Sequence, residues 1–290
     1  MKRFAVLASL IALAVAGGAK AEPAMWTVRG PHATVILFGS IHLLPKGLNW
    51  EPPALLAAVA HADEIWFELP MDPATGELVR RQIADRGALP KGDSLFNHLT
   101  AAEGERVKKV CGALGVPPAL VDAMRPWLAE VTLSLIQDMR AGAEASSGVE
   151  QEVSGQAPAS ARLRAFETVK DQVSFLADTS QAGQAASLDE TLDEIENDPN
   201  LFGRVVGEWM DGDLKALSKD ALDSMEGTSP EMYRRLITDR NRRWAVRLAG
   251  RLRGDGVVVV VVGVGHLIGP GGVPALLRAR GFRVEGPEAH

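Results

Sequence analysis

Six consecutive valines, Val257–Val262, constrain the fold of this chain more than any other stretch. An unbroken run of β-branched residues with glycines on either side predicts a strand that is buried on both faces, as in a parallel sheet covered by helices. The run is too short to span a membrane. We expect Gly263 and Gly265 to supply the backbone freedom for a sharp turn after the strand. His266 would then lie at the carboxyl end of the strand, where open α/β sheets bind their ligands.

The same pattern occurs near the start of the chain. The aliphatic strand Val35–Phe38 is followed by Gly39 and, three residues later, by His42, just as Gly263 is followed by His266. A single Gly-x-x-His is a weak signal, because a histidine after a strand is commonly an ordinary loop residue. Two copies in matched surroundings indicate two equivalent strand ends whose histidines could meet in one site.

The first 21 residues have the composition of a secretory signal peptide: a basic start, a short apolar core and the small-x-small sequence Ala19-Lys20-Ala21. We therefore expect an exported mature chain, periplasmic or secreted, without a transmembrane segment. Removing the segment takes away three of the 31 basic residues and none of the 37 acidic ones, which leaves a net charge of about −9. This charge argues against nucleic acid as a partner, because binding to phosphates needs a basic face.

Cys111 is the only cysteine. An exported chain of this composition therefore has no internal disulfide and no cysteine-rich zinc site, and it depends on packing for stability. The length suits one α/β domain, which we place at residues 22–290, with a helical insertion at about 73–137 that is interpreted as scaffold or as a lid over the substrate. The acidic stretch Asp178–Asn200 is most simply interpreted as a solvated helix face.

Two glutamates are predicted at the ends of further strands. The stretches Glu64–Glu68 and Arg162–Phe166 have the composition of short strands. Glu68 falls at the carboxyl end of the first, beside the place expected for His42, and Glu167 follows the second. For each glutamate the alternative is a structural role, in which the acid only favours the amino terminus of the next helix.

Two polar residues fall on the apolar face of a long helix predicted over Glu231–Arg253. Ile237 and Trp244 belong to that face, and Arg240 and Asn241 lie between them. Polar groups in such a position need a partner, which is either a structural hydrogen bond or a ligand.

These motifs resemble the TraB/GumN family, whose animal relatives include the Tiki proteins. The resemblance rests on the paired Gly-x-x-His, the strand-end glutamate and the sequence Arg240-Asn241-x-x-Trp244, and it covers nearly all of the mature chain. It is looser in the middle, where the family often has Gly-Leu-Asp and this chain has Gly148-Val149-Glu150. The resemblance therefore supports a role for Glu150 least of all.

The resemblance implies an α/β fold with a central mixed, largely parallel sheet and helices on both faces, similar to the erythromycin-esterase and ChaN-like group. The Tiki relatives are described as metal-dependent proteases that act with manganese or cobalt. For this chain the resemblance thus implies a hydrolase with a divalent metal cofactor and a peptide or protein substrate. The matching site residues are two histidines, two acids and the late polar pair, namely His42, His266, Glu68, Glu167, Arg240 and Asn241.

The chemistry of amide hydrolysis is consistent with these residues. Hydrolysis at neutral pH needs an activated water, a base, and positive charge that faces the developing oxyanion. A divalent metal held by His42, His266 and one carboxylate would lower the pKa of a bound water. We take Glu68 as the metal ligand and Glu167 as the catalytic base, although spacing alone leaves the order of the two acids open.

The remaining pair completes the hypothesis, in which Arg240 stabilises the oxyanion and Asn241 orients the substrate. The alternative is a periplasmic protein that binds metal, haem or a peptide without turnover. The two differ in whether Glu68, Glu167 and Arg240 converge on the histidines, because a binder needs neither a base nor an oxyanion partner. Other hydrolase and nucleotide motifs, His-Glu-x-x-His, Gly-x-Ser-x-Gly and Gly-x-x-x-x-Gly-Lys, do not occur in the sequence.

Overall fold

The computed structural model of the chain describes residues 22–288. The predicted signal peptide, residues 1–21, lies outside the described residues. Among the helices of the described part, none is both long and apolar enough to cross a membrane.

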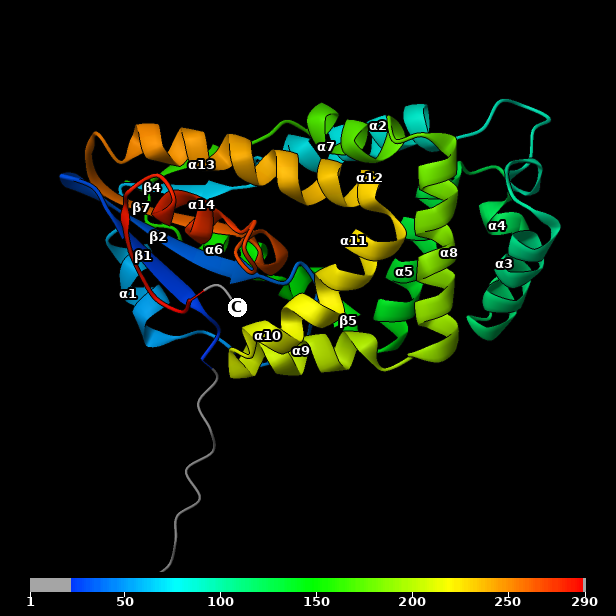
Figure 1. Ribbon diagram of the computed structural model, residues 1–290, viewed down its shortest axis with the longest axis horizontal. Coiled ribbons are helices and arrows are strands. Elements are labelled where there is room, and N and C mark those ends of the chain that lie inside the picture. The colour runs from blue at the N-terminus through cyan, green and yellow to red at the C-terminus, as the bar shows by residue number, and fades with distance from the viewer. Residues whose placement is uncertain (1–21, 289–290) are drawn as a thin grey trace, which may run out of the picture.

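A six-stranded sheet forms the centre of the fold, in the order β6-β4-β7-β2-β1-β8 (Figure 1). Its strands are β1 (Met25–Arg29), β2 (His32–Ser40), β4 (Glu64–Phe67), β6 (Arg162–Ala165), β7 (Asp255–Gly263) and β8 (Arg283–Glu285). β6, β4, β7 and β2 run parallel, whereas β1 pairs antiparallel with both β2 and β8. The predicted mixed, largely parallel sheet is confirmed.

The valine run is the inner strand β7, as the sequence predicts. β7 is hydrogen-bonded to β2 on one side and to β4 on the other. Its residues Val258–Val262 are each at most 1 % exposed. Because both faces of the strand are covered, side chains that point either way are removed from water, and a continuous apolar run is favoured over alternation.

Helices cover both faces of the sheet (Figure 1). The helices α1 (Pro53–Ala60) and α6 (Val149–Gln156) lie on one face, while α13 (Asp239–Arg251) and α14 (Val273–Arg278) lie on the other. Crossovers between parallel strands are right-handed. The chain runs outward from β2 to β6 and then returns to β7, so the helices of the return path fall on the opposite face.

The other half of the molecule is helical. It contains α2 (Pro73–Gly87), α3 (Ala101–Ala113), α4 (Ala119–Asp122), α5 (Pro126–Arg140), α7 (Val169–Ala177), α8 (Gln181–Asn197), α9 (Leu201–Asp211), α10 (Leu214–Ser218), α11 (Ser224–Thr228) and α12 (Pro230–Tyr233). Shorter elements link these. They are the strand pair β3 (Leu44–Pro45) and β5 (Ala143–Glu144), the 3₁₀-helices η1 (Leu95–His98), η2 (Ala145–Ser147) and η5 (Val264–His266), and the π-helices η3 (Lys219–Asp223) and η4 (Arg234–Thr238). Helices α3, α5 and α8 share a second apolar core, separate from that of the sheet.

The acidic stretch Asp178–Asn200 is only partly the solvated face that the sequence predicts. Most of it forms α8, whose Leu188 and Leu192 are buried in the second core. The two leucines are four residues apart and so lie on one side of the helix. Glu194 of the same helix is only partly exposed and lines a cavity beside α5 and α9.

Candidate functional site

The two Gly-x-x-His motifs end neighbouring strands of the sheet. β2 and β7 are parallel, and their register pairs Ser40 with Gly263. His42 follows β2 and His266 ends η5 directly after β7, so both lie at the same edge of the sheet. Parallel pairing thus brings together two segments that are far apart in the sequence.

The motif glycine after β7 provides space, which corrects the prediction that Gly263 and Gly265 permit a special turn. Neither has a positive φ, and Gly263 has φ −47° and ψ 133°, which other residues also adopt. A Cβ atom at Gly263 would lie 3.2 Å from Glu68 Oε1, 3.6 Å from His42 Nε2 and 3.7 Å from His266 Cδ2. A side chain at this position would crowd the point on which the polar side chains converge.

Glu68, which follows β4, lies between the two histidines. Its Oε1 accepts a hydrogen bond from the backbone N–H of Gly263 at 2.8 Å. The same oxygen lies 4.0 Å from His42 Nε2 and 3.8 Å from His266 Nε2. Its Oε2 accepts a hydrogen bond from Arg240 Nη2. One carboxylate therefore joins residues from three strand ends and from α13.

Asn241 fixes the tautomer of His266. The Asn241 Nδ2 donates to the carbonyl of Gly271 at 2.9 Å, which directs its Oδ1 toward His266 Nδ1 at 2.6 Å. An amide oxygen only accepts, so His266 Nδ1 carries a hydrogen. Burial lowers the pKa of His266 to about 3, so the ring is neutral at physiological pH. Its Nε2 therefore presents a lone pair toward Glu68.

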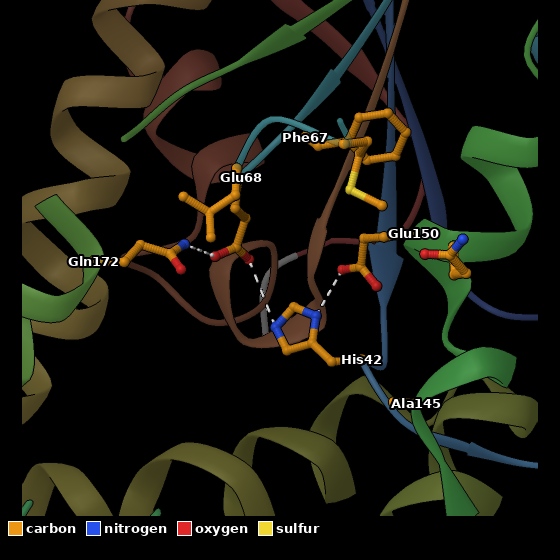
Figure 2. A pocket seen from close by; sticks show the side chains of 9 residues that line it. His42, Phe67, Glu68, Ala145, Glu150 and Gln172 are labelled. Atoms are coloured by element: carbon orange, nitrogen blue, oxygen red, sulfur yellow. Dashed lines mark hydrogen bonds and ion pairs between the residues drawn. The ribbon is translucent and has the colours of Figure 1, made fainter. Parts of the chain in front are cut away.

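Glu150 orients His42 in a similar way. Figure 2 shows the His42 ring between two carboxylates, with Nδ1 toward Glu150 and Nε2 toward Glu68. The distance from Nδ1 to Glu150 Oε1 is 2.7 Å, and the same oxygen accepts a hydrogen bond from the Ser40 hydroxyl. The negative charge of Glu150, assisted by that of Glu68, raises the pKa of His42 to about 9. His42 therefore carries a proton at neutral pH, and it must lose that proton before its Nε2 can bind a metal ion.

Arg240 lies buried between two carboxylates. It donates to Glu68 through Nη2, and to Glu167 through Nε at 3.0 Å and Nη2 at 2.8 Å. The indole of Trp244 donates to Glu167 Oε1 at 3.0 Å. Burial alone disfavours a charge on Glu68, but His266, Arg240 and His42 outweigh it and hold the pKa of Glu68 far below its usual range. Glu68 is therefore ionised and fixed in orientation.

The donor atoms suit a divalent metal ion, although they stand slightly apart. Each imidazole has its Nδ1 held by an acceptor and its Nε2 turned inward, as metal-binding histidines do. Ligand atoms around one tetrahedral ion lie roughly 3.4 Å apart, so the distances of 3.8 and 4.0 Å from Glu68 to the two imidazoles are about 0.5 Å too long. As they stand, the described side chains form no group of three or more close enough to hold an ion. A small closure of His42 and His266 on Glu68 would make the set fit.

Three cavities meet at His42. The site cavity, of about 310 Å³, is lined by Glu68, Met71, Glu150 and Gln172 among others (Figure 2). The apolar cavity, of about 290 Å³, lies between α2, α5 and α7 and is lined mainly by aliphatic and aromatic side chains, including Val79, Ile83, Trp127 and Val173. The acidic cavity, of about 430 Å³, lies between α5, α8 and α9 and is lined by Glu130, Asp138, Glu194, Asp198 and Asp220 among others. A substrate at His42 thus has room on several sides.

The six residues selected from the sequence all lie in this region: His42, Glu68, Glu167, Arg240, Asn241 and His266. Sequence reasoning missed Glu150 and Gln172. Gln172 of α7 donates to both buried glutamates, and no pattern marks it. A signal for Glu150 exists in Gly148, where a Cβ would lie 2.1 Å from the carbonyl oxygen of His42. Only glycine permits this approach, and it brings Glu150 against the histidine.

Comparison with known proteins identifies a family whose sequences are similar to this chain. The sequence profile of the TraB/PrgY/gumN family matches residues 24–286. The chain is 24 % identical over 244 residues to the uncharacterized protein YbaP of Escherichia coli (strain K12), a match that covers 83 % of this chain and 87 % of that protein. The uncharacterized protein YbaP of Shigella flexneri matches to the same extent. No solved structure matches the chain significantly.

Proposed function

The chain belongs to the TraB/PrgY/gumN family, and from its site we propose that it is a metal-dependent hydrolase of peptide-like bonds. One observation carries the proposal. The Nε2 lone pair of His266, the Nε2 of His42 and the ionised Oε1 of Glu68 face a common point. At neutral pH the proton of His42 balances the negative charge of Glu68, and a divalent metal ion would replace that proton between the three donor atoms. Imidazole nitrogens with a carboxylate oxygen are donors that divalent transition metals accept.

His42, Glu68 and His266 would hold the ion, and manganese or cobalt is the ion that we expect from the family resemblance. When bound, a divalent ion supplies Lewis acidity toward water and toward a carbonyl oxygen. The site cavity on this edge gives a substrate access, because the His42 side chain is 63 % exposed.

Glu150 is our candidate for the group that accepts the proton of the attacking water. Its Oε1 takes the hydrogen bonds from His42 and Ser40, its Oε2 does not take part in these bonds, and the residue lines the site cavity. A base must lie within hydrogen-bond reach of the proton that it takes. Glu150 is placed to do this while it also holds His42 in orientation.

Glu167, Arg240 and Asn241 are better suited to positioning than to contact with substrate, so we propose this role for them. Both oxygens of Glu167 accept hydrogen bonds from Arg240. Arg240 in turn holds Glu68, and Asn241 holds His266. These contacts hold Glu68 and His266 in fixed orientations. Such preorganisation supplies much of the catalytic effect of enzymes.

The alternative from the sequence, a protein that only sequesters a ligand, needs the histidines but not the surrounding charges. Glu68 and Glu150 face the histidines directly, and Arg240 and Glu167 reach them through Glu68; this network of charges favours the hydrolase over that alternative. We also propose that the chain acts outside the cytoplasm, because of the predicted signal peptide.

The test combines metal content with peptide cleavage. Purified protein would be analysed for bound manganese, and a mixed library of quenched fluorescent peptides would be assayed with manganese and with a chelator. The variants are His42→Ala, His266→Ala and Glu68→Gln. His32→Ala is the matched control, because His32 is exposed at the start of β2, where it follows a turn.

We expect about one ion per chain, and cleavage that needs manganese and all three site residues but not His32. Metal binding without cleavage of any peptide would contradict the hydrolase and support a binder. Cleavage that survives both the chelator and His266→Ala would contradict the assignment of the site.

A further inference from the structure

The acidic cavity reaches from the site into the helical half of the molecule. At one end it is lined by Ile41, His42 and Leu43, which follow β2. Its far walls are formed by α5, α8, α9 and η3. The cavity therefore begins at a proposed metal ligand and extends away from the sheet, in a direction that the proposed chemistry does not explain.

Five carboxylates line this cavity, and three of them lack a positive partner. Arg204 bridges Asp198 and Asp220, so the charges of these two are compensated. Glu130, Asp138 and Glu194 differ from these two. No cation among the described residues lowers their pKa values, so their charges are not compensated. Three uncompensated acids thus line one cavity.

The environment of these acids is unfavourable for their charge. Burial, together with nearby acids, raises the pKa of Glu130 to about 7 and that of Glu194 to about 7, and burial raises the pKa of Asp138 to about 6. Partly buried carboxylates of this kind are stabilised when a cation enters beside them.

Glu130 gives an independent sign of a missing partner. Its Oε1 accepts a hydrogen bond from the Ser187 hydroxyl at 2.8 Å. Its Oε2 is buried and has no hydrogen-bond partner among the described residues. A buried polar atom without a partner costs about 1–3 kcal/mol, so native proteins seldom retain one without a reason. A donor within the cavity would satisfy it.

The apolar part of the cavity lining indicates what the rest of the ligand is like. Ile195, Leu201, Phe202, Val205 and Met225 form an apolar wall in the same space as the acids. A bare metal ion would gain no stabilisation from contact with these apolar side chains. The side chains of lysine and arginine combine an apolar stem with a cationic end, and they pack along apolar surface while the charge reaches a polar group.

We propose that the acidic cavity receives the cationic side chain of a substrate residue, a lysine or an arginine next to the bond at His42. The inference rests on the proposed function for the place of that bond, whereas the recognition of the cation depends on the cavity alone. The hydrolase is then selective for basic segments of peptides, which also suits the net negative charge of the protein.

The first test measures binding without turnover. Fluorescein-labelled alanine pentapeptides with lysine, arginine, norleucine or glutamate at the centre would be titrated in the presence of a chelator, with fluorescence polarisation as the readout. Norleucine has nearly the length of lysine without its charge. We expect the lysine and arginine peptides to bind at least tenfold more tightly than the norleucine peptide.

Three variants locate the effect. Glu130→Gln combined with Glu194→Gln removes two carboxylates, and Ser134→Lys places a cation of the protein within the cavity that Ser134 lines. Either change should abolish the preference for lysine. Glu105→Gln, at an exposed acid of α3, should leave it unchanged. Equal binding of lysine and norleucine peptides, or a preference that survives Ser134→Lys, would overturn the inference.

Cleavage assays separate this inference from the proposed function. With manganese, the lysine peptide should be cleaved with at least tenfold higher kcat/KM than the norleucine peptide. Selective binding of lysine without cleavage of any peptide would refute the hydrolase and leave the cation site in place. Cleavage of all peptides at equal rates, with equal binding, would refute the cation site and leave the hydrolase in place.

Discussion

A single methyl group at Gly263 should remove metal binding while the fold remains intact. The φ and ψ of Gly263 suit alanine, so Gly263→Ala introduces no backbone strain. The new Cβ would lie 3.2 Å from Glu68 Oε1, which is only a few tenths of an ångström too close. We therefore expect the free energy of unfolding to fall by about 1 kcal/mol.

The effect on the metal should be far larger. The inner nitrogens of His42 and His266 must approach Glu68 by about 0.5 Å to reach the spacing of a metal centre. The methyl group would stand 3.6 Å from His42 Nε2 and thus within the space that this closure needs. We expect manganese affinity to fall by at least the roughly 10–100-fold that follows the loss of one supporting contact of a ligand.

The measurement is isothermal titration with manganese, together with a thermal melt to show that the variant is folded. Gly250→Ala, in α13, is the matched control, because a Cβ there meets no atom within 4 Å. A folded Gly263→Ala variant that binds manganese within twofold of the wild type would show that the ion does not bind at this convergence point. The proposed site would then be wrong.

Three further predictions follow from the surroundings of the site. Glu150→Gln should weaken manganese binding by roughly 10–100-fold by titration, because it removes the charge that orients His42; unchanged affinity would remove Glu150 from the site. Arg240→Met leaves two buried carboxylates unpaired and should lower the free energy of unfolding in urea by about 3–5 kcal/mol; a loss below 1 kcal/mol would contradict the ion network. Burial raises the pKa of Glu130 from 4.5 to about 7, so the folded chain holds this proton more tightly than the unfolded chain, and stability falls as the pH rises through that window. Glu130→Gln should remove up to about 3 kcal/mol of this dependence, as measured by urea unfolding at pH 5 and pH 8; an unchanged pH profile would refute this.

Local sequence patterns were sufficient for the strands of the sheet. The valine run predicts a doubly covered strand because no alternation is possible in it, and β7 is that strand. The two Gly-x-x-His motifs predict strand ends, and parallel pairing of β2 with β7 places them side by side. Arg240 and Asn241 were found because polar residues on an apolar helix face must have partners, and both do.

Local pattern led to a wrong explanation of one glycine and to no role for one acid. Gly263 is needed for space at a place where side chains from different strands converge, and neighbours that are distant in the chain leave no mark on local pattern. Glu150 comes from α6, in the loosest part of the family resemblance, and only packing against the carbonyl oxygen of His42 brings it to the imidazole.

The sequence by itself determined which segments are strands and helices and which side chains carry chemistry, because periodicity and residue type are local properties. Only the tertiary structure decided which of these side chains are hydrogen-bonded to one another. It assigned Glu167 to Arg240 and Trp244, Asn241 to His266, and left Oε2 of Glu130 without a hydrogen-bond partner among the described residues. Hydrogen-bond partners are chosen by distance and direction in space, and these depend on the packing of all the elements at once.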